Sequence, residues 1–230
     1  MELHGKSVVI TGVSRGIGRA LVEHFLSKDC IVCGLGRIKP DILNPNFQFY
    51  KTDIRKRIEI NDAIQLFLEV SGGRIDVVVN NAGVGYFGLI EDYDDEHITT
   101  MFETNVYGLI YLNQLVTPVM KNQGSGHIFN ISSIAGLDAF PQVSLYCATK
   151  HAVKAISESM YKELRDFGVK VTCVYPGSVK TDFFNNIDSV QANDNMLMPE
   201  DVASMIVHAS ETPANFHQVN LEIRPLRPKG

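Results

Sequence analysis

The stretch SVVITGVSRGIG, residues 7–18, runs from a β-branched apolar segment directly into a glycine-rich turn. Ala20, Leu21 and Phe25 follow at helical spacing, so the turn is expected to join a buried strand to a helix. Glycines let such a turn approach a pyrophosphate, and the N–H groups of the helix N-terminus favour the anion. The spacing G-x-x-x-G-x-G differs from the dinucleotide motif G-x-G-x-x-G, so a plain glycine-rich turn is the alternative interpretation of this stretch alone.

Short β-branched runs alternate with longer stretches of helical periodicity along the rest of the chain. This alternation is typical of repeated βαβ units, so we predict an α/β protein with a single-domain Rossmann fold: a doubly wound parallel sheet of about seven strands with helices on both faces. Strands are expected near residues 7–11, 31–35, 47–52, 76–80, 127–132, 170–175 and 219–223, and helices near residues 17–27, 57–70, 95–121, 145–167 and 199–208.

Nothing in the sequence marks a second domain, because it has no internal repeat, low-complexity tract or Pro/Gly/Ser-rich linker. A chain of 230 residues commonly forms one α/β domain, so residues 1–230 are interpreted as a single nucleotide-binding domain. Residues 37–46 contain Pro40 and Pro45 and are too short for a crossover helix. The polar residues near 183–198 are expected to form a short loop over the substrate.

Composition and charge argue against nucleic-acid and membrane partners. The net charge is -5 without a Lys/Arg-rich block, so nothing would hold a phosphate backbone. No window approaches the ~18 consecutive apolar residues of a spanning helix, and residues 1–6 lack the apolar core of a signal peptide, so we expect a cytoplasmic location. Cys30 and Cys33 form a C-x-x-C, but an odd offset on a strand places them on opposite faces, so we interpret both as core residues and predict no metal site.

Arg37 directly follows the second expected strand. At this position of a dinucleotide-binding fold an acidic residue holds the ribose 2′-hydroxyl of NAD, whereas an arginine accommodates the 2′-phosphate of NADP. Together with Arg15, Arg37 could form a positive clamp for that phosphate. We therefore predict NADP(H) as the preferred coenzyme, with NAD(H) as the alternative. The competing interpretation is that Arg37 is a solvated loop residue.

Ser133, Tyr146 and Lys150 form a third pattern, at the end of one expected strand and the start of the next helix. Tyrosine and lysine at i and i+4 share one helix face. A free phenol has a pKa of about 10, which an adjacent ammonium and an oxidised nicotinamide can lower by roughly one to three units. A pKa near the working pH suits acid–base catalysis, and the Ser133 hydroxyl could bind the substrate oxygen. A lone Y-x-x-x-K is more commonly an exposed helix pair.

The complete set of motifs occurs in a particular order: Thr11-Gly12-x-x-x-Gly16-Ile17-Gly18, Asp53, Asn80-Asn81-Ala82-Gly83, Asn105, Ser133, Tyr146 with Lys150, and Pro176-Gly177 followed by Thr181. With these motifs, along nearly its whole length, the chain resembles the short-chain dehydrogenase/reductases. The resemblance implies that Tyr146 is the general acid and base and that Ser133 polarises a carbonyl. It also implies that Lys150 holds the nicotinamide ribose and lowers the tyrosine pKa, while Asn105 anchors a water in the proton relay.

The same resemblance implies a set of coenzyme contacts. Asp53 and Ile54 look like adenine contacts, residues 81–83 like the strip under the adenosine ribose, and residues 176–181 like the segment that orients the carboxamide. The implied set is Gly12, Ser14, Arg15, Gly16, Ile17, Gly18, Arg37, Asp53, Ile54, Asn81, Ala82, Gly83, Tyr146, Lys150, Pro176, Gly177, Val179 and Thr181. Each of these positions taken singly could have a purely structural role, such as Asn81 closing a strand. Their joint occurrence favours the interpretation that they bind a coenzyme.

Loops that follow the catalytic strands supply the expected substrate-binding residues: Tyr86, Ala135, Asp138, Phe140, Val143, Phe183 and Phe184. A flat or hydrophobic carbonyl compound would fit this lining, although the same side chains could pack the loops onto the body. Residues 198–203 and the Arg-Pro tail resemble the carbonyl reductase and sepiapterin-reductase-like branches. The tail lacks the glycine-rich ending of tetrameric acyl-carrier-protein reductases.

These observations lead to one hypothesis and several alternatives. We interpret the chain as an NADP(H)-dependent oxidoreductase that moves hydride between the nicotinamide and a small carbonyl or alcohol substrate. The alternatives are an NAD(P)-dependent hydroxy-acid or alcohol dehydrogenase, a 3-oxoacyl-carrier-protein reductase, and a nucleotide-binding redox sensor without turnover. The resemblance also implies a homodimer or homotetramer formed through the helices near residues 95–121 and 145–167.

Overall fold

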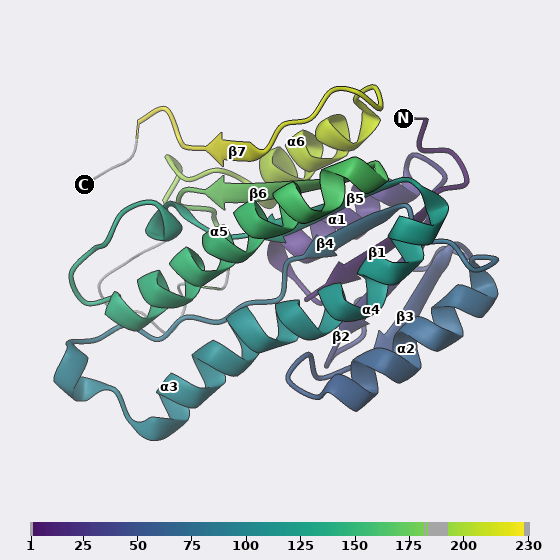
Figure 1. The fold of residues 1–230 in the computed structure, drawn as a ribbon. Helices are drawn as coiled ribbons and strands as arrows, with labels where there is room; N and C mark the ends of the chain where they lie inside the picture. The colour runs from purple at the N-terminus through teal and green to yellow at the C-terminus, as the bar shows by residue number, and fades with distance from the viewer. Residues whose placement is uncertain (1, 182, 184–192, 228–230) are drawn as a thin grey trace.

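The computed structural model describes residues 2–181, 183 and 193–227, and its centre is one parallel β-sheet. The described strands form a seven-stranded sheet in the order β3-β2-β1-β4-β5-β6-β7, with every neighbouring pair parallel (Figure 1). Their bounds are β1 Ser7–Thr11, β2 Ile31–Gly36, β3 Phe47–Lys51, β4 Val77–Asn80, β5 Gly126–Ile131, β6 Val169–Pro176 and β7 Asn220–Ile223. The predicted fold class is therefore confirmed.

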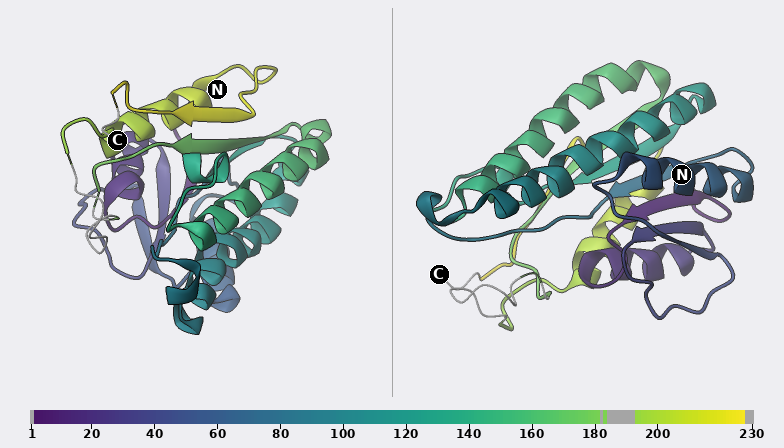
Figure 2. Two further views of the ribbon diagram at one scale, coloured as in Figure 1. Left: turned by 90° about the vertical axis from the view of Figure 1, so that its left-hand side faces the viewer. Right: turned by 90° about the horizontal axis from the view of Figure 1, so that it is seen from below.

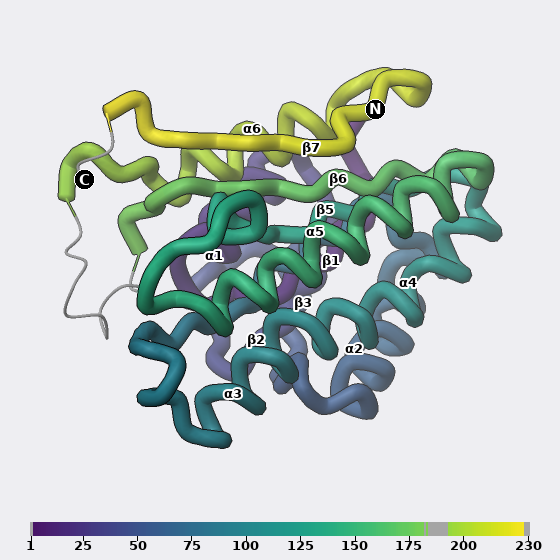
Figure 3. The backbone as a smooth tube through the Cα atoms, turned by 60° about the vertical axis from the view of Figure 1, so that its left-hand side comes forward, coloured from purple at the N-terminus to yellow at the C-terminus, as the bar shows by residue number. Residues whose placement is uncertain are grey.

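Helices cover both faces of this sheet (Figure 2). The α-helices of the described residues are α1 Gly16–Leu26, α2 Arg57–Val70, α3 Asp95–Phe102, α4 Gly108–Gln123, α5 Ser144–Leu164 and α6 Pro199–Glu211. Apolar side chains of α1 and α6 share one core with the sheet, and those of α2, α4 and α5 share the other. On that second face α4 and α5 run side by side (Figure 3). None of the described helices combines the length and apolar character that crossing a bilayer would require.

Strand β1 explains why the sheet lies between two helical layers. All five of its residues are buried, with Val8 and Ile10 in the core beneath α1 and α6 and Val9 in the core beneath α2 and α4. A strand that is apolar on both faces is typical of a parallel sheet. Cys30 and Cys33 are buried in opposite cores, as predicted from the strand alternation.

One expected helix is divided in the structure. We predicted a continuous helix over residues 95–121, whereas α3 and α4 are separated by a π-helical segment over Glu103–Tyr107, labelled η2. The wider π turn carries Asn105, whose side chain makes hydrogen bonds to the backbone of Val84. Such a turn is commonly found at functional sites, and apolar periodicity does not reveal it because the helical direction continues through it.

The sheet topology determines where a ligand can bind. The chain moves from β1 outward to β2 and β3 and then returns to place β4 on the other side of β1. Residues 37–46, all described, contain no helix between β2 and β3, as predicted from their prolines. At such a reversal of strand order the loops at the carboxyl ends of the strands separate and leave a crevice.

Candidate functional site

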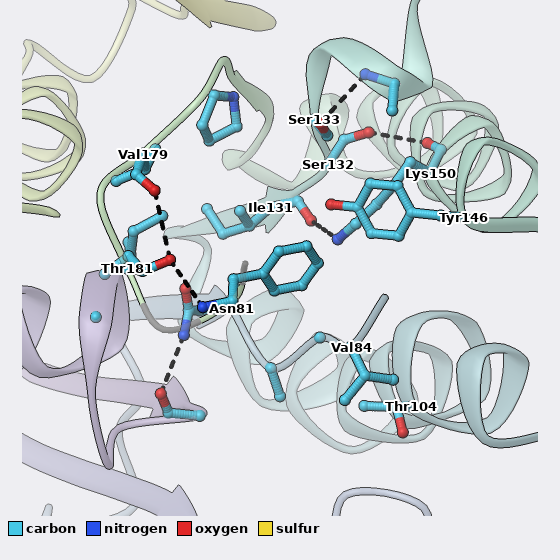
Figure 4. Close-up of a pocket in the computed structure, with 18 of the residues that line it drawn as sticks. Asn81, Val84, Thr104, Ile131, Ser132, Ser133, Tyr146, Lys150, Val179 and Thr181 are labelled. Carbon is cyan, nitrogen blue, oxygen red and sulfur yellow. Dashed lines mark hydrogen bonds between the residues drawn. The ribbon is translucent and has the colours of Figure 1, made fainter. Parts of the chain in front are cut away.

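A cavity of about 910 Å³ lies at the carboxyl edge of the sheet. Its lining comes from the glycine-rich turn after β1, the loops after β2, β3, β4 and β5, the start of α5 and the segment after β6. Figure 4 shows Tyr146 and Lys150 on one side of this cavity and Val179 and Thr181 on another. The expected coenzyme, catalytic and substrate residues therefore share one cavity, with the exceptions described below.

The glycine-rich turn fits a nucleotide phosphate. Gly12 and Gly16 have positive φ angles of 72° and 55°, and a Cβ on Gly12 would lie 2.9 Å from the Cα of Ala82. At the start of α1 the N-cap residue Arg15 makes no side-chain capping bond and the first turn holds no acidic residue. The N-terminal N–H groups of this described helix are therefore not capped by a side chain, which is the arrangement an anion requires.

Gly18 has a different place from the one predicted. It does not belong to the cavity lining, because it is buried against the turn itself: a Cβ there would lie 2.1 Å from the Gly12 carbonyl oxygen. Its role is close packing of α1 against the turn, whereas the other coenzyme residues implied by the resemblance line the cavity.

Asn81 holds the end of β4 against the end of β1. Its Nδ2 donates to the carbonyl oxygens of Thr11 and Gly12 at 2.9 and 3.2 Å. The backbone N–H groups of Asn81 and Ala82 donate to the Thr11 hydroxyl at 3.0 and 2.9 Å. The side chain of Asn81 thus shapes the phosphate turn in addition to lining the cavity.

Charged residues gather at the end of the cavity near β2 and β3. Arg15 and Arg37 are exposed and line this end, and Asp53 lies beside them. Arg55, which the sequence analysis missed, contacts the Asp53 carboxylate with Nη2 2.6 Å from Oδ2 and with Nε 3.0 Å from Oδ1. These contacts lower the pKa of Asp53, and Arg37 adds a smaller effect in the same direction. This end of the cavity can bind a phosphate outside the pyrophosphate cradle.

The residues expected to be catalytic meet at the opposite end of the cavity. Ser133 follows β5, and Tyr146 and Lys150 lie one turn apart at the start of α5. Lys150 is only 4 % exposed, and its Nζ donates to the carbonyl oxygen of Ile131 at 2.9 Å and lies 5.6 Å from the centre of the Tyr146 ring. The Ser133 Oγ accepts from the Ala135 N–H at 3.2 Å, and its hydroxyl lies at the Tyr146 phenol and lowers the pKa of that group.

The protonation of Tyr146 differs from the prediction. Burial raises the pKa of the phenol, a hydrogen bond with Ser133 acts in the opposite direction, and no effect of Lys150 is resolved. Burial also lowers the pKa of Lys150 to about 8. In the protein without coenzyme, desolvation therefore outweighs the ammonium placed beside the ring, and the acidic phenol expected from the ammonium together with an oxidised nicotinamide stays a prediction.

Asn105 lies behind the cavity surface and is not part of its lining. Its Oδ1 accepts from Val84 N–H at 2.8 Å, and its Nδ2 donates to the Val84 carbonyl at 2.8 Å and to the Thr149 hydroxyl at 3.0 Å. A Cβ on Gly83 would lie 3.3 Å from Asn105 Oδ1 and 3.5 Å from Lys150 Nζ. Asn105 therefore positions the strip after β4 beside the lysine, and the role of water anchor stays a prediction.

The segment after β6 lies beside the glycine-rich turn, and its expected role of orienting the carboxamide stays a prediction. Pro176, Gly177, Val179 and Thr181 line the cavity. A Cβ on Gly16 would lie 3.1 Å from the Thr181 methyl carbon, so glycine at the start of α1 lets the two loops approach. A ligand bound to the turn would touch both halves of the sheet.

The expected substrate residues are only partly brought together. Tyr86, Ala135, Phe140, Val143 and Phe183 line the cavity. Asp138 does not; its carboxylate faces away and lies 3.8 Å from Arg224 of the C-terminal segment. Phe184 and most of the expected loop near 183–198 lie outside the described residues.

Phe87 and Gln142 also line the substrate end, and the sequence analysis did not identify them. Their loops are joined, because the N–H of Gly88 donates to the Gln142 carbonyl at 2.8 Å. The aromatic pair Tyr86-Phe87 after the glycines was the available signal for Phe87. No local signal marks Gln142, since its position depends on a contact between distant loops.

Known proteins resemble this chain both in sequence and in fold. Residues 6–192 match the sequence profile described as short chain dehydrogenase. An uncharacterized oxidoreductase of Staphylococcus haemolyticus is 32% identical over 98% of this chain and 99% of its own length. The solved structure of ElxO with NADP bound is 31% identical, has a TM-score of 0.86, and the match covers 96% of this chain and 98% of that one. The closed form of serine dehydrogenase complexed with NADP+ is 30% identical with a TM-score of 0.88, and the match covers 94% of each chain.

Proposed function

The chain belongs to the short-chain dehydrogenase family and is an oxidoreductase, and we propose that it transfers hydride between NADP(H) and a small carbonyl or alcohol substrate with Tyr146 as general acid and base. The observation that carries the proposal is the convergence of Ser133, Tyr146 and Lys150 at one end of a cavity that has an uncapped helix N-terminus at the other. A reacting carbon and a nucleotide phosphate can thus be held together.

The residues present fit NADP(H). The glycine-rich turn and the start of α1 would hold the pyrophosphate, and Arg15 and Arg37 would bind the ribose 2′-phosphate. Two similar structures, ElxO and serine dehydrogenase, were solved with NADP, which supports the same choice here. When bound, the coenzyme supplies a hydride in its reduced form and a positive ring charge in its oxidised form.

Tyr146 and Ser133 act on the oxygen of the substrate. In the reductive direction the carbonyl carbon gains a hydride while the carbonyl oxygen gains the proton of Tyr146, and the alcohol and oxidised coenzyme are the products. The Ser133 hydroxyl donates to the same oxygen and stabilises its developing charge. Lys150, which lies one helical turn from the phenol, would bind the nicotinamide ribose.

The raised pKa of Tyr146 keeps the phenol protonated at neutral pH in the protein without coenzyme. Because burial keeps the phenol protonated, the residue begins the cycle as a proton donor. Alcohol oxidation needs the deprotonated phenol instead, so its rate is expected to increase as the pH rises, whereas the reductive rate falls where the phenol loses its proton.

The proposal is tested by replacing Tyr146 with phenylalanine. The absorbance of NADPH is followed with a panel of aldehydes, ketones and diketones, and kcat is expected to fall roughly 10²- to 10⁴-fold because the proton donor is lost. NADPH binding, measured by fluorescence titration, should persist. Tyr161→Phe, on the same helix but outside the cavity lining, is the matched control and should keep full activity.

A wild-type protein that binds NADPH and reduces nothing in a broad panel would contradict the proposal and favour the nucleotide-binding sensor.

We also propose assembly as a homodimer or homotetramer through α4 and α5, and a cytoplasmic location. Light scattering that returns a monomer at micromolar concentration would contradict the assembly.

A further inference from the structure

Three aromatic rings form a triangle around the reactive hydroxyl. The ring centres of Phe87 and Tyr146 are 5.9 Å apart, those of Tyr146 and Phe183 are 5.6 Å apart, and those of Phe87 and Phe183 are 6.3 Å apart. All three pairs are tilted or edge-on, which is the favourable geometry for aromatic contacts. The rings of Phe87 and Phe183 therefore form an apolar wall beside Tyr146 in the same cavity.

Packing of the neighbouring backbone holds this aromatic triangle of Phe87, Tyr146 and Phe183 together. A Cβ on Gly85 would lie 2.7 Å from Phe183 Cζ and 3.0 Å from Phe87 Cε1, so only glycine lets both rings approach the chain at this point. The Phe183 N–H donates to the Thr181 hydroxyl at 3.3 Å. The apolar wall is thus built into the loops after β4 and β6.

Charges are distributed unevenly along the cavity. Within the described lining, Arg15, Arg37, Asp53 and Arg55 lie at the end near β2 and β3, and Lys150 is the other charged residue. Lys150 is 4 % exposed and donates one of its N–H groups to a backbone carbonyl, and in the proposed function its ammonium binds the nicotinamide ribose, so it is committed to the coenzyme rather than to a substrate carboxylate.

Among the described residues, the cation Arg224 lies near the substrate end and is already paired. Arg224 passes beside Gly177, with its Cα 3.5 Å from where a Cβ of that glycine would lie, and its guanidinium contacts the carboxylates of Glu222 and Asp138. The sequence of residues 184–192, which the structure does not describe, contains no lysine or arginine. The described part of the molecule therefore offers no counter-ion for a carboxylate held against Tyr146.

Gln142 supplies a neutral polar group at the same end. It lines the cavity in a left-handed conformation with φ 63°, and its carbonyl accepts from Gly88 N–H at 2.8 Å and from Tyr93 Oη at 3.3 Å. A non-glycine residue retained in this conformation costs about 1 kcal/mol or more, and such strain is concentrated at functional sites. An amide in this place can bind a carbonyl or hydroxyl oxygen without adding charge.

We propose that the substrate end selects uncharged carbonyl compounds with an apolar or aromatic substituent and rejects 2-oxo acids and hydroxy acids. The selectivity comes from Phe87 and Phe183, which would force a carboxylate to lose water against two ring faces without a cation to replace it. The inference depends on the proposed function and decides between two of its alternatives, the carbonyl reductase and the hydroxy-acid dehydrogenase.

Methyl benzoylformate and benzoylformate test this inference, because the two compounds share the same ketone and ring and differ in charge. With NADPH and the wild-type protein, kcat/KM for the ester is expected to exceed that for the acid roughly 100-fold, as for a charged group left without a partner. Equal or greater efficiency with the acid would overturn the inference and leave the proposed function standing. Failure with both compounds and with the full carbonyl panel would overturn the proposed function and this inference together.

Two variants identify the responsible residues. Gln142→Arg adds a cation at an exposed position and should lower the ester-to-acid ratio about tenfold or more, because arginine binds carboxylates in a bidentate manner. Phe87→Leu keeps an apolar residue but removes the ring, and should lower kcat/KM for the ester roughly tenfold while NADPH binding is unchanged. An unchanged ratio in the first variant together with unchanged ester kinetics in the second would contradict the assigned roles.

Discussion

Lys150 is a buried ammonium, and its desolvation lowers the free energy of unfolding of the protein. Its Nζ has a backbone carbonyl partner at 2.9 Å, and burial lowers the pKa from 10.5 to about 8. Below about pH 8 both the folded and the unfolded chain carry the proton, so the desolvation penalty is fully present. Between these two pKa values the unfolded chain binds more protons, so this penalty becomes smaller as the pH rises.

Lys150→Met should therefore have a stability advantage that depends on pH. We expect the free energy of unfolding of the variant, relative to wild type, to be greater at about pH 7 than at about pH 9.5, by about 2 kcal/mol. Urea denaturation at the two pH values measures this difference. Lys162→Met, at an exposed position of the same helix, is the control for loss of a lysine charge, and an equal difference in that variant would contradict the explanation.

Arg37 is expected to determine the coenzyme preference. Arg37→Asp should lower the NADP-to-NAD ratio of kcat/KM by roughly 10- to 100-fold. The variant loses a charge-assisted bond to the 2′-phosphate of NADP and repels that phosphate, whereas the new carboxylate can accept hydrogen bonds from the ribose hydroxyls of NAD. Lys39→Asp is a matched control in the same loop, outside the described cavity lining. An unchanged ratio in Arg37→Asp would remove this residue from the proposed phosphate site.

At the level of elements, the start of α4 is the point where a helix directly supports the nucleotide end of the cavity. A Cβ on Gly108 would lie 2.8 Å from both the Ile54 side chain and the Ile54 carbonyl oxygen. Ile54 lines the cavity, and the π segment η2 ends immediately before Gly108. The close approach of α4 to the loop after β3 thus requires glycine at position 108, because any side chain there would collide with Ile54.

Gly108→Ala should separate the helix from that loop. We expect a loss of about 1–3 kcal/mol in the free energy of unfolding, as for an overpacked core, together with weaker NADPH binding because Ile54 moves. Gly88→Ala is the matched control, since its Cβ would meet Asp92 at 3.5 Å, an ordinary contact. Similar stability losses in both variants would contradict the proposed importance of the α4 contact.

At the level of the whole molecule, the cavity joins the two halves of the sheet. The phosphate turn follows β1, whereas the facing segment from Pro176 to Thr181 follows β6 on the far side of β4 and β5. A coenzyme that contacts both halves would stabilise the folded chain as a unit, because the unfolded chain has no such site.

The wild-type protein should therefore unfold at a higher temperature with NADPH. At a concentration of about 100 times Kd the stabilisation is about 2.7 kcal/mol, which raises Tm by roughly 5–10 °C for a chain of this size. Differential scanning calorimetry measures the shift, and NAD(H) at the same concentration should give a smaller one. Absence of a shift at millimolar NADPH would contradict the assigned coenzyme.

Local sequence patterns were sufficient for most of the fold. The bounds of β1 and α2 agree with the predicted residues 7–11 and 57–70, because β-branched runs and helical periodicity report directly on neighbours along the chain. The π segment was missed, since it inserts into a helix without changing its apolar face. Among the site residues, motif order placed Ser133, Tyr146 and Lys150 in one cavity.

The amino-acid sequence by itself determined the parallel α/β architecture, the glycine-rich turn and the side chains proposed to be catalytic, because each depends on residue types at short separations. Only the tertiary structure placed Phe87 and Gln142 at the substrate end, paired Asp138 with Arg224, and buried Tyr146 enough to raise its pKa. These features depend on distances between loops from different strands and on the exclusion of water, and both quantities exist only when the whole chain has packed.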